Sequence, residues 1–202
     1  MLLSYYKKGQ IEAGTDEAGR GCLAGPVTAA AVILPPNFKH DKLRDSKKLT
    51  EKIREELYII IKEKAIAYSV QMLGPRRIDS INILNASIEA MHLSLNALQT
   101  KPEFVLVDGN RFKAFEDIPH ACIIKGDDKY LSIAAASILA KVERDRYMKN
   151  LAVQFPEYYW HTNKGYPTKQ HRSAIKEFGS TKHHRKSFNL LGKEAQVKIF
   201  AE

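Results

Sequence analysis

Cysteine is scarce in this chain of 202 residues, where Cys22 and Cys122 are the only two. Two isolated thiols exclude a disulfide framework and favour a reducing compartment, so we expect a cytoplasmic protein. Neither cysteine stands near a second cysteine or a histidine at the spacing of a zinc site. The sequence therefore gives no reason to expect structural zinc.

Long apolar runs are also missing. The longest, residues 29–34 and 57–61, are far too short to span a bilayer, and the first eight residues have no apolar core of the kind found in a signal peptide. We find no internal repeat and no low-complexity linker. We therefore expect no membrane association. The length of 202 residues suits either one large domain or a domain with an appendage.

The positive charge is unevenly distributed. The formal net charge is +9, and residues 161–193 contain eight lysines or arginines against one acid, Glu177, together with four of the seven histidines. Such a segment is either a solvated basic face or a binding surface for a polyanion such as nucleic acid. The hydrophobic content of 44% and the charged content of 27% are typical of a globular protein with a substantial core.

The apolar periodicity predicts an α/β protein with a mixed sheet covered by helices. Thr50 and Thr168 stand where they can cap helices, because each precedes a run with helical periodicity. The region after about Tyr158 is predicted to be a helical appendage without a core of its own, which divides the chain into residues 1–157 and 158–202. The predicted strands are residues 11–16, 28–34, 67–73, 104–108 and 121–124, and the predicted helices are residues 51–65, 78–98, 131–148 and 168–178.

Residues 14–26 are the most informative segment. Asp16 and Glu17 open this run, which contains four glycines and a single arginine. Carboxylate oxygens suit hard cations such as Mg²⁺, and glycine lets the main chain approach a ligand closely. The combination indicates a metal ion held close to a phosphate, against the alternative of a glycine-rich turn with solvated acids.

Further acids end or follow predicted strands. Asp108 closes the strand 104–108, and Asp127 and Asp128 follow the strand 121–124. Carboxylates that converge at neighbouring strand ends repel one another, and protons or divalent cations must relieve that repulsion. With oxygen ligands and no Cys or His cluster, Mg²⁺ or Mn²⁺ is the expected occupant.

Two points stay open at this level. The tripeptide at residues 108–110, Asp-Gly-Asn, taken alone is better explained as a turn. Successive residues of a strand also point to opposite faces, so Asp16 and Glu17 cannot both face one metal ion from a regular strand. Either the strand ends between them, or one of them acts through its backbone carbonyl.

Five blocks resemble type 2 ribonuclease H, specifically ribonuclease HII, and they occur in the order typical of that family. The blocks are residues 14–32, 45–49, 107–109, 125–127 with 132–145, and 163–171. The resemblance implies a ribonuclease H-like fold, with a mixed five-stranded sheet flanked by helices and a C-terminal helical extension. It implies hydrolysis of the RNA strand of RNA–DNA hybrids. It also implies cleavage 5′ of single ribonucleotides in duplex DNA, which leaves a 3′-hydroxyl and a 5′-phosphate.

By this resemblance, the catalytic and metal-binding acids are Asp16, Glu17, Asp108 and Asp127, and the Lys-Gly-Asp pattern favours Asp127 over its neighbour Asp128. Two Mg²⁺ or Mn²⁺ ions held by these acids would flank the scissile phosphate. One would activate a water and the other would stabilise the leaving 3′-oxygen. No histidine is then needed as a general base.

The resemblance also implies contacts to the substrate. Gly19, Arg20 and Gly21, with Tyr166, are expected to read the RNA-to-DNA junction through the 2′-hydroxyl that distinguishes RNA from DNA.

Phosphate contacts are expected at four basic residues. These are Lys47, Lys48, Lys141 and Arg144, with a solvated helix face as the alternative for the last two.

The roles of two further residues, Ser137 and Cys22, stay open at this level. Ser137 either lies near the site or only packs. Cys22 stands where the family commonly has proline, and packing is favoured over a reactive role.

The last residues resemble a clamp-binding peptide. Gln196-Val197-Lys198-Ile199-Phe200 is similar to the bacterial sliding-clamp-binding pentapeptide, with Val197 and Ile199 where leucines are usual. A terminal helix that packs Val197 and Phe200 is the favoured alternative.

Taken together, these features predict a monomeric enzyme with RNA–DNA hybrid and ribonucleotide-containing DNA duplexes as its partners. The competing hypotheses are another ribonuclease H-like nuclease, such as a DNA junction resolvase, and a non-catalytic hybrid-binding protein. A requirement for a ribonucleotide in the substrate would distinguish the predicted enzyme from another ribonuclease H-like nuclease. The intact set of acids argues against the second.

Overall fold

A five-stranded mixed sheet of order β3-β2-β1-β4-β5 forms the centre of the computed structural model, which describes residues 2–43, 46 and 49–192. β1, β2 and β3 are antiparallel neighbours, whereas β4 and β5 run parallel to β1. The strands are β1 (Glu12–Ala18), β2 (Val27–Ile33), β3 (Ala67–Leu73), β4 (Phe104–Asp108) and β5 (His120–Ile123). The predicted fold class is confirmed, and the strand 67–73 and the strand 104–108 have the predicted bounds.

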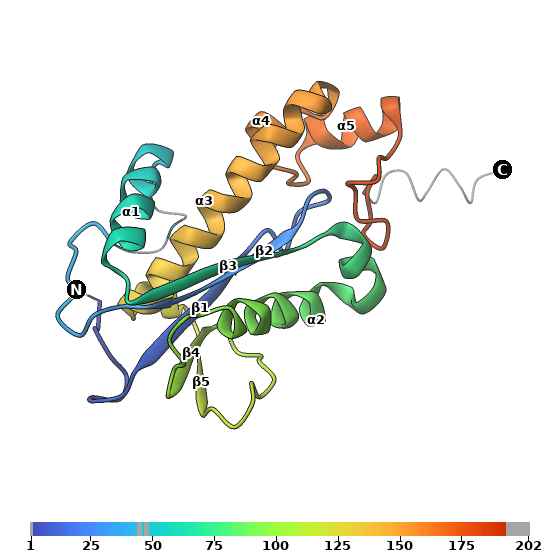
Figure 1. Ribbon diagram of the computed structural model, residues 1–202. Coiled ribbons are helices and arrows are strands. Elements are labelled where there is room, and N and C mark those ends of the chain that lie inside the picture. Colours follow the sequence, from blue (N-terminus) through green and yellow to red (C-terminus); the bar gives the residue numbers. More distant parts are fainter. Residues whose placement is uncertain (1, 44–45, 47–48, 193–202) are drawn as a thin grey trace.

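Helices cover both faces of this sheet (Figure 1). α3 lies against β1 and β2 with α1 packed beside it, and α2 covers the other face against β2 and β3. The helices are α1 (Glu51–Lys64), α2 (Pro75–Asn96), α3 (Leu131–Gln154), α4 (Trp160–Asn163) and α5 (Lys169–Phe178), with short 3₁₀ turns η2 (Gly126–Asp128) and η3 (Pro156–Tyr158). As predicted, the Thr50 and Thr168 hydroxyls cap α1 and α5 by accepting hydrogen bonds from the backbone of Ile53 and His171.

Each face of the sheet has its own apolar layer. All seven residues of β2 are buried, because helices cover that strand on both sides. Its alternating side chains divide between the two layers: Ala30 and Val32 pack with α1 and α3, and Ala29 and Ala31 pack with α2. The small alanine side chains allow both helices to approach the sheet closely.

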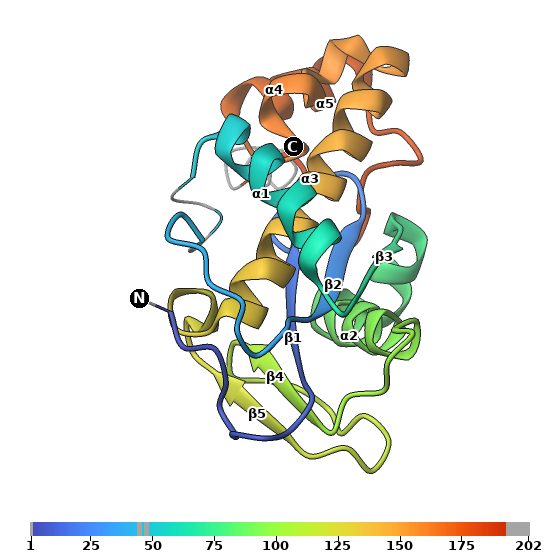
Figure 2. The same cartoon turned by 60° about the vertical axis from the view of Figure 1, so that its left-hand side comes forward.

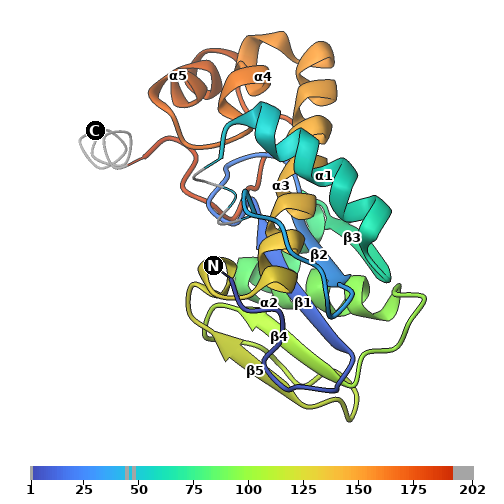
Figure 3. The same cartoon turned by 90° about the vertical axis from the view of Figure 1, so that its left-hand side faces the viewer.

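The region that follows α3 turns back beyond one end of the sheet, where α4 and α5 lie beside the far end of α3 (Figures 2 and 3). Its interior is built around Trp160, which is fully buried and stacks on Tyr158 at 5.0 Å between ring centroids. The same apolar cluster includes Met148 of α3 and Leu23 and Ala24 of the β1–β2 connection. This core is therefore shared with the rest of the chain, and the division at residues 157 and 158 stays a prediction.

Two helices differ from their predicted bounds by three residues or more. α2 starts at Pro75 rather than at residue 78, and it contains a kink at Asn82, whose φ of 64° lies in the left-handed region. The Asn82 side chain accepts a hydrogen bond from the backbone N of Asn85 at 3.1 Å, so the helix restarts there with a side-chain cap. α3 continues to Gln154, six residues past the predicted end. In the described part of the chain, none of the helices has the length and apolar character needed to cross a membrane.

Candidate active site

Two adjacent acids lie within β1. The strand continues through Ala18, so the alternative in which it ends between Asp16 and Glu17 is wrong. Asp16 is buried, its carboxylate accepts a hydrogen bond from the Glu17 backbone N at 2.6 Å, and the nearby Ser137 hydroxyl of α3 opposes the rise in its pKa. Ser137 in turn contacts the hydroxyl of Ser46 at 2.9 Å. Ser137 therefore lies at the site and does not merely pack.

The Glu17 side chain borders a cleft. Its carboxylate accepts a hydrogen bond from the Arg20 guanidinium at 3.0 Å. Together with Asp108, Asn110 and Arg111 and residues of α2, it lines a cavity of about 270 Å³. Two acids and two arginines thus face one open space at the end of the central strands.

Asp108 ends β4, the strand beside β1 in the sheet. Its carboxylate accepts a hydrogen bond from the backbone N of Gly126 at 2.7 Å, which fastens the end of β4 to η2. Asp127, the next residue of that turn, is buried. Parallel pairing of β4 with β1 and this hydrogen bond bring the predicted acids of three separate segments to one end of the sheet.

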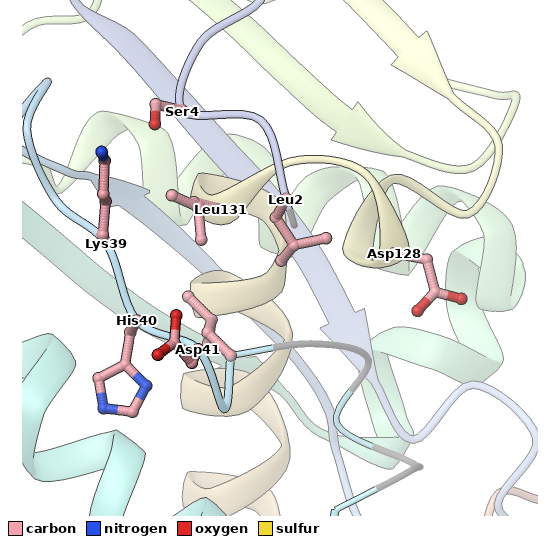
Figure 4. Close-up of a pocket in the computed structure, with 8 residues that line it drawn as sticks. Leu2, Ser4, Lys39, His40, Asp41, Asp128 and Leu131 are labelled. Carbon is pink, nitrogen blue, oxygen red and sulfur yellow. The ribbon is translucent and has the colours of Figure 1, made fainter.

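Asp128 is exposed and belongs to a different cavity. That cavity has a volume of about 460 Å³ and is lined by Leu2, Lys39, His40 and Asp41 among others (Figure 4). None of the four predicted catalytic acids lines it. The smaller cleft beside Glu17 and Asp108 is therefore the candidate active site.

Electrostatic repulsion is concentrated at these acids. Burial, followed by the charges of Glu17 and Asp108, holds the pKa of Asp16 well above its usual value. Burial also raises the pKa of Glu17, and the Asp108 charge adds to this, while the Arg20 guanidinium opposes it. A cation placed among the acids would relieve this repulsion.

The donor set fits a hard divalent cation, because it consists of carboxylate oxygens. Among the residues that the structure describes, however, no group of three His, Cys, Asp or Glu side chains is gathered as a metal site. The charge of Asp108 thus lies close enough to raise the pKa of Asp16 and Glu17, although these acids are not drawn together into a metal-binding cluster.

The loop 19–26 continues directly from β1. Gly19 is buried with φ of 89°, and the loop is fastened by a hydrogen bond from the Leu23 backbone N to the Gly165 carbonyl at 2.8 Å. Tyr166 follows Gly165, and the Cys22 thiol lies near enough to its hydroxyl to raise the pKa of Tyr166 together with burial, the larger cause. Sequence segments some 140 positions apart are therefore joined, so that the predicted junction-reading residues Gly19, Arg20, Gly21 and Tyr166 belong to one unit.

Lys141 and Arg144, two of the residues predicted to contact phosphate, differ in their surroundings and in their burial. Lys141 forms an ion pair with Asp145 at 2.6 Å and lies 5.8 Å from the centre of the Tyr166 ring. Arg144 differs from the prediction: it is fully buried and donates to the carbonyls of Pro26, Ala24 and Lys164, so its guanidinium cannot reach a phosphate. Lys47, Lys48 and the pentapeptide 196–200 lie outside the described residues.

A buried histidine pair supports Tyr166, and no pattern in the sequence predicts it. The Trp160 indole donates to His171 Nε2 at 3.0 Å, which makes that nitrogen an acceptor, so His184 Nε2 donates to it at 3.2 Å. His171 Nδ1 then donates to the Tyr166 carbonyl at 2.9 Å, and His184 Nδ1 accepts from the Thr181 backbone N. Burial lowers the pKa of His171 and lowers that of His184 to about 4, so both rings are neutral at pH 7.

Arg185 is the second feature that sequence reasoning missed. It is fully buried, although it belongs to the basic segment that composition assigned to the surface. No local pattern separates it from the exposed lysines around it, because its burial is determined by contacts with a loop 160 positions earlier in the chain.

Comparisons with family models, curated proteins and solved structures all match ribonucleases of type HII or H2. The family model described as Ribonuclease HII matches residues 13–191. The Ribonuclease HII of Phocaeicola vulgatus is 57% identical over 199 residues, which are 98% of this chain and 99% of that protein. Among solved structures, the ribonuclease H2 from Pyrococcus horikoshii OT3 has a TM-score of 0.76 at 26% identity and covers 92% of this chain and 97% of its own. The structure of the PCNA:RNase HII complex from Archaeoglobus fulgidus matches with a TM-score of 0.73 at 30% identity over 91% of this chain and 97% of that chain.

Proposed function

The chain belongs to the ribonuclease HII family and is therefore an RNA-strand endonuclease, and we propose that it also cuts duplex DNA at single embedded ribonucleotides. The proposed cut lies on the 5′ side of the ribonucleotide and leaves a 3′-hydroxyl and a 5′-phosphate. Recognition of one ribonucleotide requires a group that senses a single 2′-hydroxyl next to the cleavage machinery.

The observation that supports this proposal is the joining of the acids to the loop and to Tyr166. β1 carries Asp16 and Glu17 and continues into the loop 19–26, while the Leu23–Gly165 hydrogen bond holds Tyr166 against that loop. Tyr166 keeps 40% of its surface exposed, so its ring is available to a sugar. A ribose placed over the loop would then lie beside the acids that cut its phosphodiester.

In this proposal, Asp16, Glu17, Asp108 and Asp127 hold two Mg²⁺ or Mn²⁺ ions. When bound, such ions supply Lewis-acid chemistry that activates a water and stabilises a leaving 3′-oxygen. The protein groups have separate tasks: Ser137 orients the Asp16 carboxylate, and the Gly126 backbone N orients that of Asp108.

The direct test offers the purified protein a DNA duplex with one ribonucleotide, in Mg²⁺ or in Mn²⁺, beside an all-DNA duplex of the same sequence. We expect one cut 5′ of the ribonucleotide, none in the all-DNA duplex, and none by the Asp108→Asn variant. Cleavage of the all-DNA control would instead favour a DNA nuclease. A folded protein that binds the duplex without cutting it in either metal would favour the hybrid-binding alternative.

The chain offers a matched pair of acids as an internal control. Asp127 is buried in η2 and Asp128 is exposed beside it, so the two asparagine variants differ by one position and carry the same charge change. We expect Asp127→Asn to lower kcat by at least about 100-fold and Asp128→Asn to stay within about threefold of wild type. The reverse order would show that the Lys-Gly-Asp pattern assigns the wrong acid.

The C-terminal pentapeptide allows a second proposal. The matched archaeal RNase HII was solved in complex with PCNA, and residues 196–200 resemble a clamp-binding peptide of bacteria. We propose that this tail tethers the enzyme to a bacterial sliding clamp. Pull-down of the clamp by the full chain, lost on deletion of residues 196–202, would support the tether, and no pull-down by the full chain would refute it.

A further inference from the structure

Two arginine side chains lie beneath the loop 19–26, and both are fully buried. Arg144 comes from α3 and donates from Nε to the Pro26 carbonyl at 2.9 Å and from Nη2 to the Ala24 carbonyl at 3.1 Å. Arg185 donates from Nε to the Gly25 carbonyl at 3.0 Å and from Nη1 to the Arg20 carbonyl at 2.8 Å. Four carbonyls of one short loop are thus bound by two guanidinium groups.

Burial of two like charges is unfavourable unless something compensates for it. Neither Arg144 nor Arg185 forms an ion pair with a carboxylate among the described residues. Burial and the neighbouring Arg144 charge lower the pKa of Arg185 to about 10, so it still carries its charge at pH 7. The negative ends of the four loop carbonyls compensate for part of this cost, because each accepts a hydrogen bond from a guanidinium group.

The backbone around Arg185 reinforces the same attachment. The Arg185 backbone N donates to the Leu23 carbonyl at 2.8 Å, and the Gly25 backbone N donates to the His183 carbonyl at 2.9 Å, on either side of a bridge between Ala24 and His184. The C-terminal segment around His184 therefore runs antiparallel to the loop.

Arg185 is also anchored from the opposite side. The Asp79 carboxylate of α2 accepts hydrogen bonds from the backbone N atoms of Lys186 and Ser187, each at 3.0 Å. The segment that presents Arg185 is thus held between α2 and the loop.

Tyr166 depends on the same pair. The centre of its ring lies 5.9 Å from the Arg144 guanidinium carbon, and Arg144 Nη1 donates to the Lys164 carbonyl two residues before it. A Cβ on Gly165 would lie 2.5 Å from the Ala24 carbonyl oxygen, which shows how closely the Tyr166 turn approaches the loop. Displacing Arg144 would therefore disturb the loop and the Tyr166 turn directly, whereas Arg185 acts on that turn through the loop.

We propose that Arg144 and Arg185 are positioning residues that set the main chain of the loop 19–26 and the Tyr166 ring in the arrangement that reads a 2′-hydroxyl. The reading itself rests on the proposed function above, whereas the positioning of the loop does not. Arg185 acts only through the loop carbonyls, and it contributes no contact to the substrate or to the acids.

The test compares Arg185→Met with Arg172→Met. Arg172 is a matched control, because it too donates to main-chain carbonyls of the C-terminal region, at Asn189 and Leu190, but makes no contact with the loop. Both variants are assayed at a temperature at which thermal unfolding shows them fully folded. The readouts are kcat and KM on the duplex with one ribonucleotide, and hydrogen exchange of the peptide that covers residues 19–26.

For Arg185→Met we expect kcat to fall about 10- to 100-fold with KM changed less than about threefold, because misplacement of the reading loop affects alignment more than phosphate binding. Exchange in residues 19–26 should accelerate at least about tenfold, since amides of a released loop open locally. Arg172→Met should leave both readouts within about twofold. Arg185→Lys keeps the positive charge and can still donate to one of the carbonyls. Its kcat and its exchange rate in residues 19–26 should lie between those of Arg185→Met and wild type.

Each outcome decides the proposal. Wild-type kcat and unchanged exchange in a folded Arg185→Met variant would overturn it, and if that variant does not fold, Arg185→Lys is judged on the same two readouts. If wild type does not cut at the ribonucleotide, the proposed function fails. The exchange data still decide whether Arg185 positions the loop.

Discussion

A methyl group added at Gly19 should damage the protein far more than one added at Gly21, two positions away. Gly19 has φ of 89°, and a Cβ there would lie 1.9 Å from Nε and 2.5 Å from Cδ of Arg144. Gly21 lies outside the left-handed region, and its Cβ would meet no atom within 4 Å among the described residues. The two substitutions to alanine are chemically identical, so any difference between them reports the environment.

The magnitude for Gly19→Ala follows from two costs. An alanine in the left-handed region costs about 1–2 kcal/mol. Arg144 cannot simply move aside, because its three nitrogens are bonded to three carbonyls, and losing one such charged hydrogen bond costs about 1.5–3 kcal/mol. We therefore expect the free energy of unfolding to fall by about 2.5–5 kcal/mol, which in a domain of this size lowers Tm by about 5–20 °C. For Gly21→Ala we expect less than about 1 kcal/mol.

The assay is urea unfolding of both variants, followed by cleavage of the one-ribonucleotide duplex under conditions where each is folded. Gly21→Ala should keep its stability and still lose activity, because its methyl group projects into the open space over which we place the ribose. Equal unfolding midpoints for the two variants would refute the argument that Gly19 packs on a fixed Arg144. Full activity of Gly21→Ala would refute the placement of the ribose.

Three further predictions concern single interactions. His184 has a pKa of about 4 in the fold against about 6.5 in the unfolded chain, so the unfolded chain binds more protons between these values. The free energy of unfolding should therefore fall as the pH drops through that range. From pH 7 to pH 5, the urea midpoint should drop less in His184→Gln than in wild type. Ser137→Ala removes a hydrogen bond that lowers the pKa of Asp16, so the acid limb of the pH profile of kcat/KM should move to higher pH without loss of stability beyond about 1–2 kcal/mol. Thr168→Ala removes the cap of α5 and should cost about 1 kcal/mol in the free energy of unfolding, and Thr50→Ala should cost less because its bond of 3.4 Å is longer, both measured by thermal unfolding.

The sheet could be predicted from sequence because its signals are local. A run of buried apolar residues marks β2 and β4 wherever the chain places them, and the two threonine caps depend only on their immediate neighbours. The kink at Asn82 was missed because the apolar spacing of α2 continues across it. The side-chain cap that restarts the helix is visible only once the backbone is known.

The acids could be predicted to lie at one end of the sheet because they end or follow predicted strands, and the ends of neighbouring strands lie close together. The direction of each side chain follows from strand alternation, which predicts that Asp16 and Glu17 cannot both face one metal ion from a regular strand. β1 continues through both acids, and they face different sides: Asp16 lies toward Ser137 of α3, whereas Glu17 borders the cleft lined by α2. Both acids still sense the charge of Asp108, because it stands at the end of the adjacent strand.

Arg144 and Arg185 show why composition is a weak guide to a basic residue. A guanidinium has five donors in a rigid plane, so it can satisfy several carbonyls at once inside a protein as well as a phosphate outside it. Which of the two it does depends on whether a loop with unpaired carbonyls lies within reach. The loop 19–26 is such a loop, because its glycines and tight turns leave carbonyls unpaired by any strand. If this main chain stays near a ribose, as we propose, it cannot bury those carbonyls in a sheet, and two cationic side chains bind them from beneath instead.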